Sequence, residues 1–166
     1  MKLPKSGRLH HRSLQESLFR LGSAIYTPSL KLIWRAVDGP TLMKGFRDKV
    51  PPLIGPVQVL VSVPKRRRRK AVDRVLMRRR IREAYRASAL PLFAKVNDLT
   101  EVRTLSVALV YSKDCNLDYL EVREDMEKLI EKLIGKLEKR YQIKTTETKD
   151  NEKTAQDSDC SDGTSD

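Results

Sequence analysis

Residues 57–63 have the sequence Val-Gln-Val-Leu-Val-Ser-Val and are followed directly by Pro64. A short segment that is β-branched almost throughout is typical of a central strand covered on both faces. Pro64 lacks the N–H that a strand ladder requires, so it ends this strand. Leu105 to Tyr111 has a similar sequence, Leu-Ser-Val-Ala-Leu-Val-Tyr. These two segments predict two buried strands at the centre of a sheet.

The segments next to these strands are predicted to be helical. One helix can run from Ala71 to about Leu90, where Pro91 is expected to stop it. From Glu121 to Tyr141, apolar residues recur at helical spacing, which predicts a long amphipathic helix packed on the sheet. One helix between two buried strands and another after them favour an α+β fold, a two-layer sandwich of sheet and helices.

The first part of the chain has weaker patterns. Ser13 and Glu16 have the spacing of a capping box, which predicts a first helix that ends near Gly22. Ser29 to Arg35 alternates apolar and polar residues, with one exception, as a half-buried strand does. Asp38 to Pro56 is rich in Pro and Gly, so it is expected to be a functional or partly disordered loop.

Charge divides the chain into two parts. The sequence has 34 Lys and Arg against 22 Asp and Glu, a net charge of +12. Residues 145–166 contain two lysines against seven acids, so residues 1–144 carry +17. Such a surplus indicates a polyanionic partner, either a nucleic acid or an anionic membrane surface. We predict a binding domain over residues 1–144 and an acidic tail over 145–166, which is disordered because it has no apolar periodicity.

Several common kinds of site are not expected. Cys115 and Cys160 have no CxxC or His/Cys partner, so neither a disulfide framework nor a zinc site is predicted. The longest apolar stretch, residues 57–63, is too short to span a membrane, and the basic N-terminus leads into no signal peptide, so we expect a cytoplasmic protein. His10 and His11 lack a third ligand, and acids such as Asp125 suit the start of a helix, so no catalytic or metal-binding residue is predicted.

The most basic segment runs from Lys65 to Arg86. Twelve of its 22 residues are basic and two are acidic. On a helix with about 100° per residue, basic and apolar side chains occupy opposite halves of the circumference. The basic half holds Lys70, Arg74, Arg78, Arg79, Arg82 and Arg86, and the apolar half holds Leu76, Met77, Ile81, Ala84 and Tyr85. Because arginine grips phosphates through paired hydrogen bonds and stacks on bases, this pattern predicts an RNA-binding face, with a merely solvated basic face as the alternative.

Four groups of residues, in order along the chain, carry a family resemblance. They are Leu3-Pro4-Lys5-Ser6-x-Arg8-Leu9, Leu18-Phe19-x-x-Gly22, Ser62-Val63-Pro64-Lys65, and Lys70-Ala71-Val72-Asp73-Arg74 with Arg78-Arg79-x-x-Arg82-Glu83-Ala84-Tyr85-Arg86. These groups resemble the pattern of the bacterial ribonuclease P protein component. The likeness extends over about Leu3 to Tyr141, and the basic helix is its most specific part.

The resemblance implies a fold and a function. The fold is a four-stranded sheet with helices on one side and a left-handed βαβ crossover, also found in a ribosomal-protein domain. The function is that of the protein subunit of ribonuclease P, an endoribonuclease (a hydrolase) that matures tRNA. The subunit would bind the catalytic RNA and the 5′ leader of precursor tRNA and promote endonucleolytic removal of the leader. Catalysis is then expected from the RNA, with Mg²⁺ bound chiefly by the RNA subunit, and neither a protein partner nor a membrane is expected.

The resemblance also assigns site residues. RNA contacts would come from Lys65, Arg67, Lys70, Arg74, Arg78, Arg79, Arg82 and Arg86. Phe19 would contact the leader strand in a cleft between the first helix and the sheet. The chain departs from the family pattern at Val75 and Leu76, where the family usually has Asn and Arg, and at Gln15 and Ile25, where it often has apolar or aromatic residues.

Two other functions remain open on the sequence alone. One is a ribosomal or general RNA-binding protein with no role in cleavage. The other is a eukaryotic protein in which Arg66 to Lys70 is a nuclear address, which is disfavoured because the strongest charge lies within a predicted helix. Faster leader removal when the protein is added to a bare ribonuclease P RNA at low Mg²⁺ would separate ribonuclease P function from the first of these alternatives.

Overall fold

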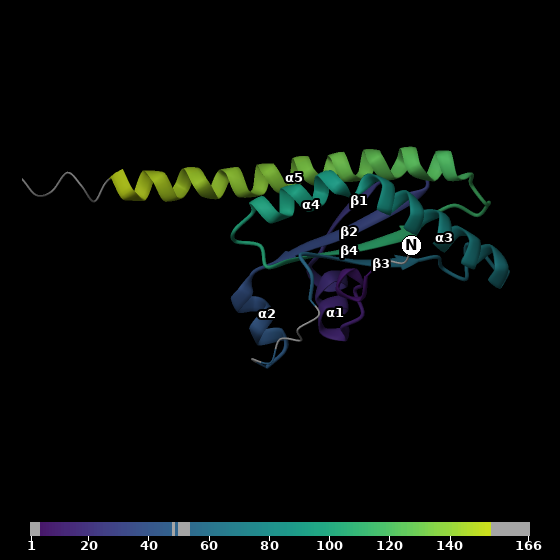
Figure 1. Cartoon of the computed structure of the whole chain (residues 1–166), viewed down its shortest axis with the longest axis horizontal. Helices are drawn as coiled ribbons and strands as arrows, with labels where there is room; N and C mark the ends of the chain where they lie inside the picture. Colours follow the sequence, from purple (N-terminus) through teal and green to yellow (C-terminus); the bar gives the residue numbers. More distant parts are fainter. Residues whose placement is uncertain (1–3, 48, 50–53, 154–166) are drawn as a thin grey trace, which may run out of the picture.

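The computed structural model describes residues 4–47, 49 and 54–153, with side chains described up to Tyr141. A single four-stranded sheet lies at its centre (Figure 1). The strands are β1 (Ser23–Tyr26), β2 (Leu30–Val37), β3 (Val57–Ser62) and β4 (Thr104–Tyr111), and they lie in the order β1-β2-β4-β3. β1 with β2 and β2 with β4 are antiparallel, whereas β3 and β4 are parallel. The two strands predicted to be buried are thus direct neighbours, but β3 is the last strand in this order, so its predicted place at the centre of the sheet is wrong, whereas β4 is central.

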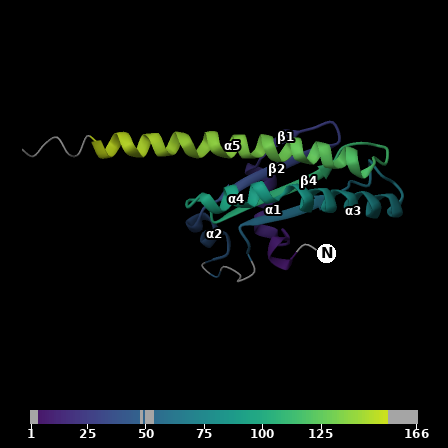
Figure 2. The same cartoon turned by 45° about the horizontal axis from the view of Figure 1, so that its top comes forward.

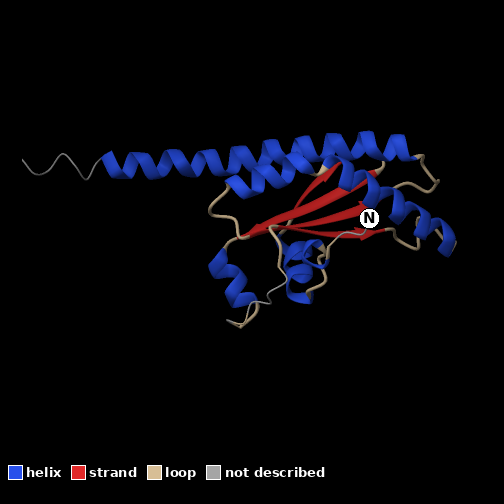
Figure 3. Ribbon diagram, viewed as in Figure 1, coloured by secondary structure: helices blue, strands red, loops and turns tan. Residues whose placement is uncertain are grey.

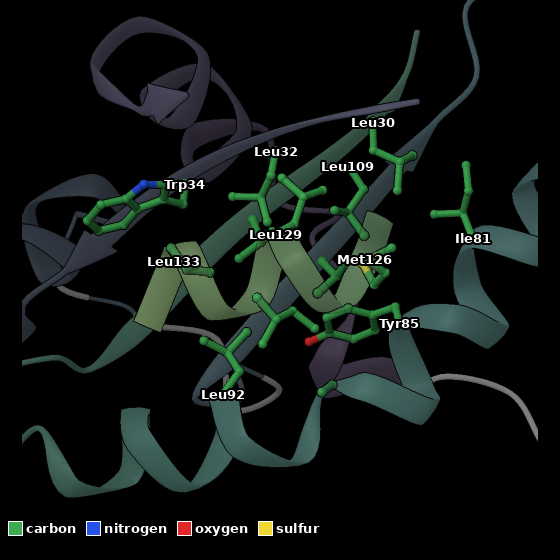
Figure 4. Packing of buried hydrophobic residues seen from close by; sticks show 14 of the residues in the cluster. Leu30, Leu32, Trp34, Ile81, Tyr85, Leu92, Leu109, Met126, Leu129 and Leu133 are labelled. Carbon is green, nitrogen blue, oxygen red and sulfur yellow. The ribbon is translucent and has the colours of Figure 1, made fainter. Parts of the chain in front are cut away.

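One face of the sheet carries the main helical layer. This layer consists of α3 (Ala71–Ser88), α4 (Leu90–Asp98) and α5 (Tyr119–Lys153), which lie together on the same side of the strands (Figure 3). The main core lies between this layer and the sheet, and its buried side chains interleave from both (Figure 4). Met126 and Leu129 of α5, for example, are fully buried against the strands. The predicted amphipathic packing of the last helix on the sheet is confirmed.

The opposite face of the sheet carries a smaller cluster. Two helices, α1 (Arg12–Leu21) and α2 (Gly39–Gly45), lie on this side below the strands in Figure 1, and a short 3-10 turn at Lys5–Gly7 precedes them. Their buried side chains meet the odd-numbered side chains of β2 and the even-numbered ones of β4. The cluster comprises Leu9, Leu14, Leu18, Val37, Leu42 and Ala108. Strands β2 and β4 are therefore covered on both faces, which was predicted for residues 105–111 of β4, whereas β2 was predicted to be only half-buried.

The predicted fold class is confirmed. The chain has an α+β fold with a four-stranded mixed sheet and its main helical layer on one side. β3 and β4 are joined through α3 and α4, which is the βαβ crossover that the resemblance implies. The left hand of this crossover stays a prediction.

The predicted capping box at the start of the first helix is wrong. α1 begins at Arg12 with His11 as its N-cap, so Ser13 already lies inside the helix. Glu16 pairs with Arg12 one turn earlier, at 2.7 Å between Oε1 and Nε, rather than with a backbone N–H. An ion pair at this spacing offers Glu16 a charged partner, which a capping box does not.

The predicted single helix from Ala71 to Leu90 is two helices. α3 ends at Ser88, and Leu90 begins α4, with Pro91 in its first turn. Proline is favoured there because the first helical N–H groups have no partner within the helix. Pro91 therefore marks the beginning of a helix rather than the end of one.

Two short elements are absent from the predictions. β1 follows Gly22 directly, and α2 lies within the segment Asp38 to Pro56, which was expected to be a loop. α2 has the N-terminal signal of a helix, with Asp38 as N-cap and Pro40 in the first turn. Residues 50–53, with the Pro51–Pro52 pair, lie outside the described residues.

α5 is longer than the apolar pattern predicts. Its backbone continues past Tyr141 to Lys153, and this part extends beyond the sheet (Figure 2). The helix thus includes residues 145–153, which the composition assigns to the disordered tail. Extending an existing helix avoids the cost of a new nucleus, which explains the continuation. The rest of the predicted tail, residues 154–166, lies outside the described residues.

A buried carboxylate holds α5 to the turn between β1 and β2. Asp125 accepts hydrogen bonds from the backbone N–H of Ser29, at 2.9 Å, and from the Ser29 hydroxyl. Ser29 is 1% exposed and Asp125 8% exposed. The interpretation of this acid as structural rather than catalytic is therefore supported by its partner.

Replacing Asp125 with Ala should destabilise the fold. The substitution leaves the Ser29 donors buried without an acceptor, so the free energy of unfolding should fall by about 2 kcal/mol. Urea denaturation followed by circular dichroism measures this difference. Glu124→Ala, at the exposed neighbouring position, is the matched control and should change little; equal denaturation midpoints for the two variants would contradict the structural role.

Candidate nucleic-acid interface

The rotation of α3 decides which side chains it presents to solvent. Met77, Ile81, Ala84 and Tyr85 are at most 2% exposed and pack against α5 and the sheet. Burial raises the pKa of Tyr85, so its hydroxyl stays protonated and the ring serves the core. Leu76 was predicted to share this apolar side, but it is 37% exposed and points away from the core. The buried stripe is thus narrower than the sequence predicts.

None of the eight basic residues predicted to contact RNA is buried. Lys65, Lys70, Arg79 and Arg82 are exposed, and Arg67, Arg74, Arg78 and Arg86 are half-buried. The structure therefore keeps all of them at the surface, on α3 or on the turn that leads into it. Five of the eight, Arg67, Arg74, Arg79, Arg82 and Arg86, fall into two groups with different surroundings, and the structure places Lys65, Lys70 and Arg78 in neither group.

One group organises the basic turn before α3. Arg68, which was not among the predicted contacts, pairs with Asp73 at 2.6 Å, and both side chains are less than a quarter exposed. Arg67 pairs with Asp114 at 3.0 Å. Arg74 donates from Nη1 to the backbone oxygens of Arg68, at 3.0 Å, and Arg69. These contacts fold the turn onto the first residues of α3 and onto the loop after β4.

Asp73 is the centre of this network. Its second oxygen accepts a hydrogen bond from Asn116 at 3.1 Å. That hydrogen bond, together with the Arg68 guanidinium, holds the pKa of Asp73 below its ordinary value. The carboxylate therefore stays ionised, and Asp73 links the basic turn to the loop that precedes α5.

The other group borders a groove. The groove lies between α3 and the edge of β3, has a volume of about 890 Å³, and is lined on the α3 side by Arg79, Arg82, Glu83 and Arg86. Val59, Leu60 and Val61 form its strand side. Among the residues that the structure describes, neither Arg79 nor Arg82 takes part in an ion pair or a side-chain hydrogen bond, whereas Arg86 pairs with Glu83 at 3.0 Å. Both guanidinium groups are thus available to an anion.

The N-terminal segment closes the groove on its far side. Leu9 donates its N–H to the Val59 carbonyl at 3.1 Å, and Arg8 forms a parallel bridge with Val59. Arg8 and His10 consequently line the same groove as Arg79 and Arg82. Two motifs that lie about 70 residues apart in the sequence meet here. Arg8 belongs to the first of these motifs, and its place in the motif was the only signal that could have identified it as a groove residue.

Phe19 lies on the other side of the sheet. It is 53% exposed on α1, in a shallow pocket lined also by Arg12, Gln15, Glu16 and Arg20. The Gln15 side chain is bound to the N-terminal segment, because its Nε2 donates to the Leu9 carbonyl at 3.0 Å. Ile25 is 5% exposed and belongs to the main core, so it does not share a surface with Phe19. An exposed aromatic ring between two arginines is suited to stack on an unpaired base.

The two histidines have structural surroundings. The His11 ring packs edge-on against Phe46, with 5.2 Å between centroids, and desolvation and His10 lower its pKa. His10 is hydrogen-bonded through Nδ1 to the Arg8 carbonyl at 2.9 Å. Over the described part of the chain, no three His, Cys, Asp or Glu side chains gather as metal ligands would. No described helix is both long and apolar enough to cross a membrane.

A known family resembles this chain in sequence, and known proteins resemble it in fold. A family model described as Ribonuclease P matches residues 3–134. The ribonuclease P protein of Thermotoga maritima has a similar solved structure, with 16% identity and a TM-score of 0.51 over 75% of this chain and 96% of that one. The ribonuclease P protein of Staphylococcus aureus is similar at 14% identity and a TM-score of 0.50 over 76% of this chain and 94% of that one. No curated protein matches the chain.

Truncation of Arg68 and truncation of Arg82 should have different effects on thermal stability. Arg68→Ala leaves Asp73 without its ion pair, so the midpoint of thermal unfolding should fall by about 3 °C. Arg82→Ala removes a side chain without a described partner and should leave the midpoint nearly unchanged, or raise it by relieving repulsion. Differential scanning calorimetry of both variants measures the contrast. A larger fall for Arg82→Ala would contradict this division of roles.

Proposed function

The chain belongs to the ribonuclease P protein family, and from this premise we propose that it binds the catalytic RNA of ribonuclease P and the 5′ leader of precursor tRNA, promoting endonucleolytic removal of the leader. The groove beside α3 is the observation that carries this proposal. It gathers Arg79, Arg82 and Arg86 of α3 and, on its opposite side, Arg8 of the N-terminal segment. A folded RNA offers phosphates at regular intervals, and a row of guanidinium groups on a rigid helix can follow them.

The positions of the groove and Phe19 support a division of labour. The groove lies at the edge of β3, whereas Phe19 lies on α1, across the sheet from α3 (Figure 1). One RNA molecule could therefore occupy the groove while the single-stranded leader of another meets α1. Holding both would raise the affinity of the complex for precursor over mature tRNA, since only the precursor has a leader.

The protein contributes binding and positioning in this proposal. Its described side chains offer no group that we assign to bond cleavage. The Mg²⁺ ions that such cleavage requires would be bound chiefly by phosphates of the RNA subunit, which are hard oxygen ligands of the kind Mg²⁺ prefers. The basic groove would then stabilise the folded RNA that holds these ions.

Reversing the charge of the two unpaired groove arginines should abolish the stimulation of cleavage. We expect Arg79→Glu with Arg82→Glu to lose the acceleration that the wild-type protein gives to a bare bacterial ribonuclease P RNA at low Mg²⁺, because the groove would repel phosphates. The rate of leader removal from precursor tRNA is the measurement. The pair is preferred to one that includes Arg74, which also holds the basic turn.

A matched control makes this result specific. Lys128→Glu with Lys132→Glu makes the same change in net charge on the exposed side of α5, away from the groove. This variant should keep most of the acceleration at moderate salt. Equal loss in both variants would indicate a response to net charge alone. No acceleration by the wild-type protein would instead favour a general RNA-binding protein.

Phe19 provides a separate test of leader binding. Phe19→Ala should weaken binding of precursor tRNA by the ribonuclease P complex by about tenfold, the loss of one base-stacking contact. Binding of mature tRNA should be unchanged, because it has no leader. Leu21→Ala, which truncates another exposed apolar residue of the same helix, 65% exposed against 53% for Phe19, is the control. Equal losses for precursor and mature tRNA would refute the assignment of Phe19.

A further inference from the structure

An apolar strip runs along the solvent side of the most basic helix. Val72 is 78% exposed, Val75 40% and Leu76 37%. These positions are spaced three and four residues apart, so their side chains are neighbours on one surface of α3. The helix end that carries them extends past the sheet (Figure 1). We call these three residues the apolar strip.

The packing of the helix does not account for the apolar strip. The side of α3 that packs on α5 and the sheet is formed by Met77, Ile81 and Tyr85. Valine is a poor helix former because its branched side chain loses freedom, so helix propensity does not favour it either. At each of the three positions, a polar side chain would have a lower free energy in contact with water. A ligand that covers the strip would offset the cost of exposing it.

The charges around the apolar strip indicate what would cover it. Arg79 lies one turn beyond Val75 and Leu76, and Arg78 lies one turn beyond Val75. Arg69 and Lys70, both exposed, precede the strip. A cationic border of this kind repels a basic partner and attracts a polyanion. The occupant therefore has to combine phosphates for the border with apolar surface for the strip.

We infer that the apolar strip contacts an unpaired base, with its ribose, in the RNA whose phosphates the neighbouring arginines bind. This inference rests on the proposed function and adds that the RNA is not a plain duplex at this point. In a duplex the base faces are stacked on one another, and only an unpaired nucleotide offers an apolar face to aliphatic side chains. The strip selects RNA structure, while the arginines supply affinity.

A comparison of two RNA probes tests the inference. The probes are a short single-stranded RNA without self-complementarity and the duplex that it forms with its complement. Val75→Thr with Leu76→Gln removes apolar surface while keeping side-chain size and the helix. Binding of the single strand should weaken by about fivefold, because the variant buries less apolar surface against the base. Binding of the duplex should not change.

Salt dependence separates base contacts from phosphate contacts. The slope of log affinity against log salt counts phosphates neutralised, so it should be the same for this variant and the wild type. Arg82→Glu should instead reduce the slope for both probes. Leu90→Gln, which changes a 76%-exposed leucine on α4, should affect neither probe. Far-UV circular dichroism confirms that each variant is folded.

Three results would overturn the inference. They are unchanged single-strand binding in the Val75→Thr, Leu76→Gln variant, equal weakening of the two probes, and a reduced salt slope. The first would leave a protein partner as the occupant of the apolar strip. Because the measurement uses no ribonuclease P RNA and no cleavage, it succeeds or fails independently of the leader-removal assay that tests the proposed function.

Discussion

The rotation of α3 about its own axis is the constraint on which the interface depends. One side of this helix buries Met77, Ile81 and Tyr85 against α5 and the sheet, and each such side chain contributes about 1.5–3 kcal/mol when removed from water. Any other rotation would expose these side chains and bring guanidinium groups into the core, at a cost of several kcal/mol for each charge. Apolar burial and charge solvation therefore select the same orientation. The arginines are held at the surface by the packing of residues that are themselves buried.

The topology of the sheet places this helix beside a second basic segment. Parallel strands such as β3 and β4 cannot be joined by a tight turn, so the chain has to cross over one face of the sheet, and α3 makes that crossing. β3 is also the last of the four strands, with a backbone edge open to pairing. The N-terminal segment pairs with this edge at Val59 and brings Arg8 opposite α3. The groove thus arises from two ordinary requirements of a sheet, a crossover connection and a covered edge.

The sequence predicts the parts of this structure in which a pattern repeats. The strands at 57–63 and 105–111 and the helix after Glu121 are marked by runs of apolar residues, and α3 is marked by its buried stripe. β1 is only four residues long and α2 seven, which is too short for a period to show. The prediction for Leu76 was wrong because a helical wheel gives only the angles between side chains. It does not give the width of the stripe that α5 and the sheet bury. The groove could not be predicted from spacing, because only the strand pairing brings residues 8 and 79 together.

The ion pairs of the basic segment neutralise some of its arginines and leave others without a carboxylate partner. Arg67, Arg68, Arg80 and Arg86 each pair with a carboxylate, and the pairs of Arg67 and Arg80, with Asp114 and Asp118, tie the segment to the chain between β4 and α5. The pairs reduce repulsion along the turn and at both flanks of α3. Part of the remaining repulsion lies at Arg79 and Arg82, which face the groove without a carboxylate partner among the described residues. A polyanion that enters the groove relieves this repulsion, and a ligand bound only by the folded state stabilises that state. The fold and its RNA partner are therefore expected to stabilise each other through the same few charges.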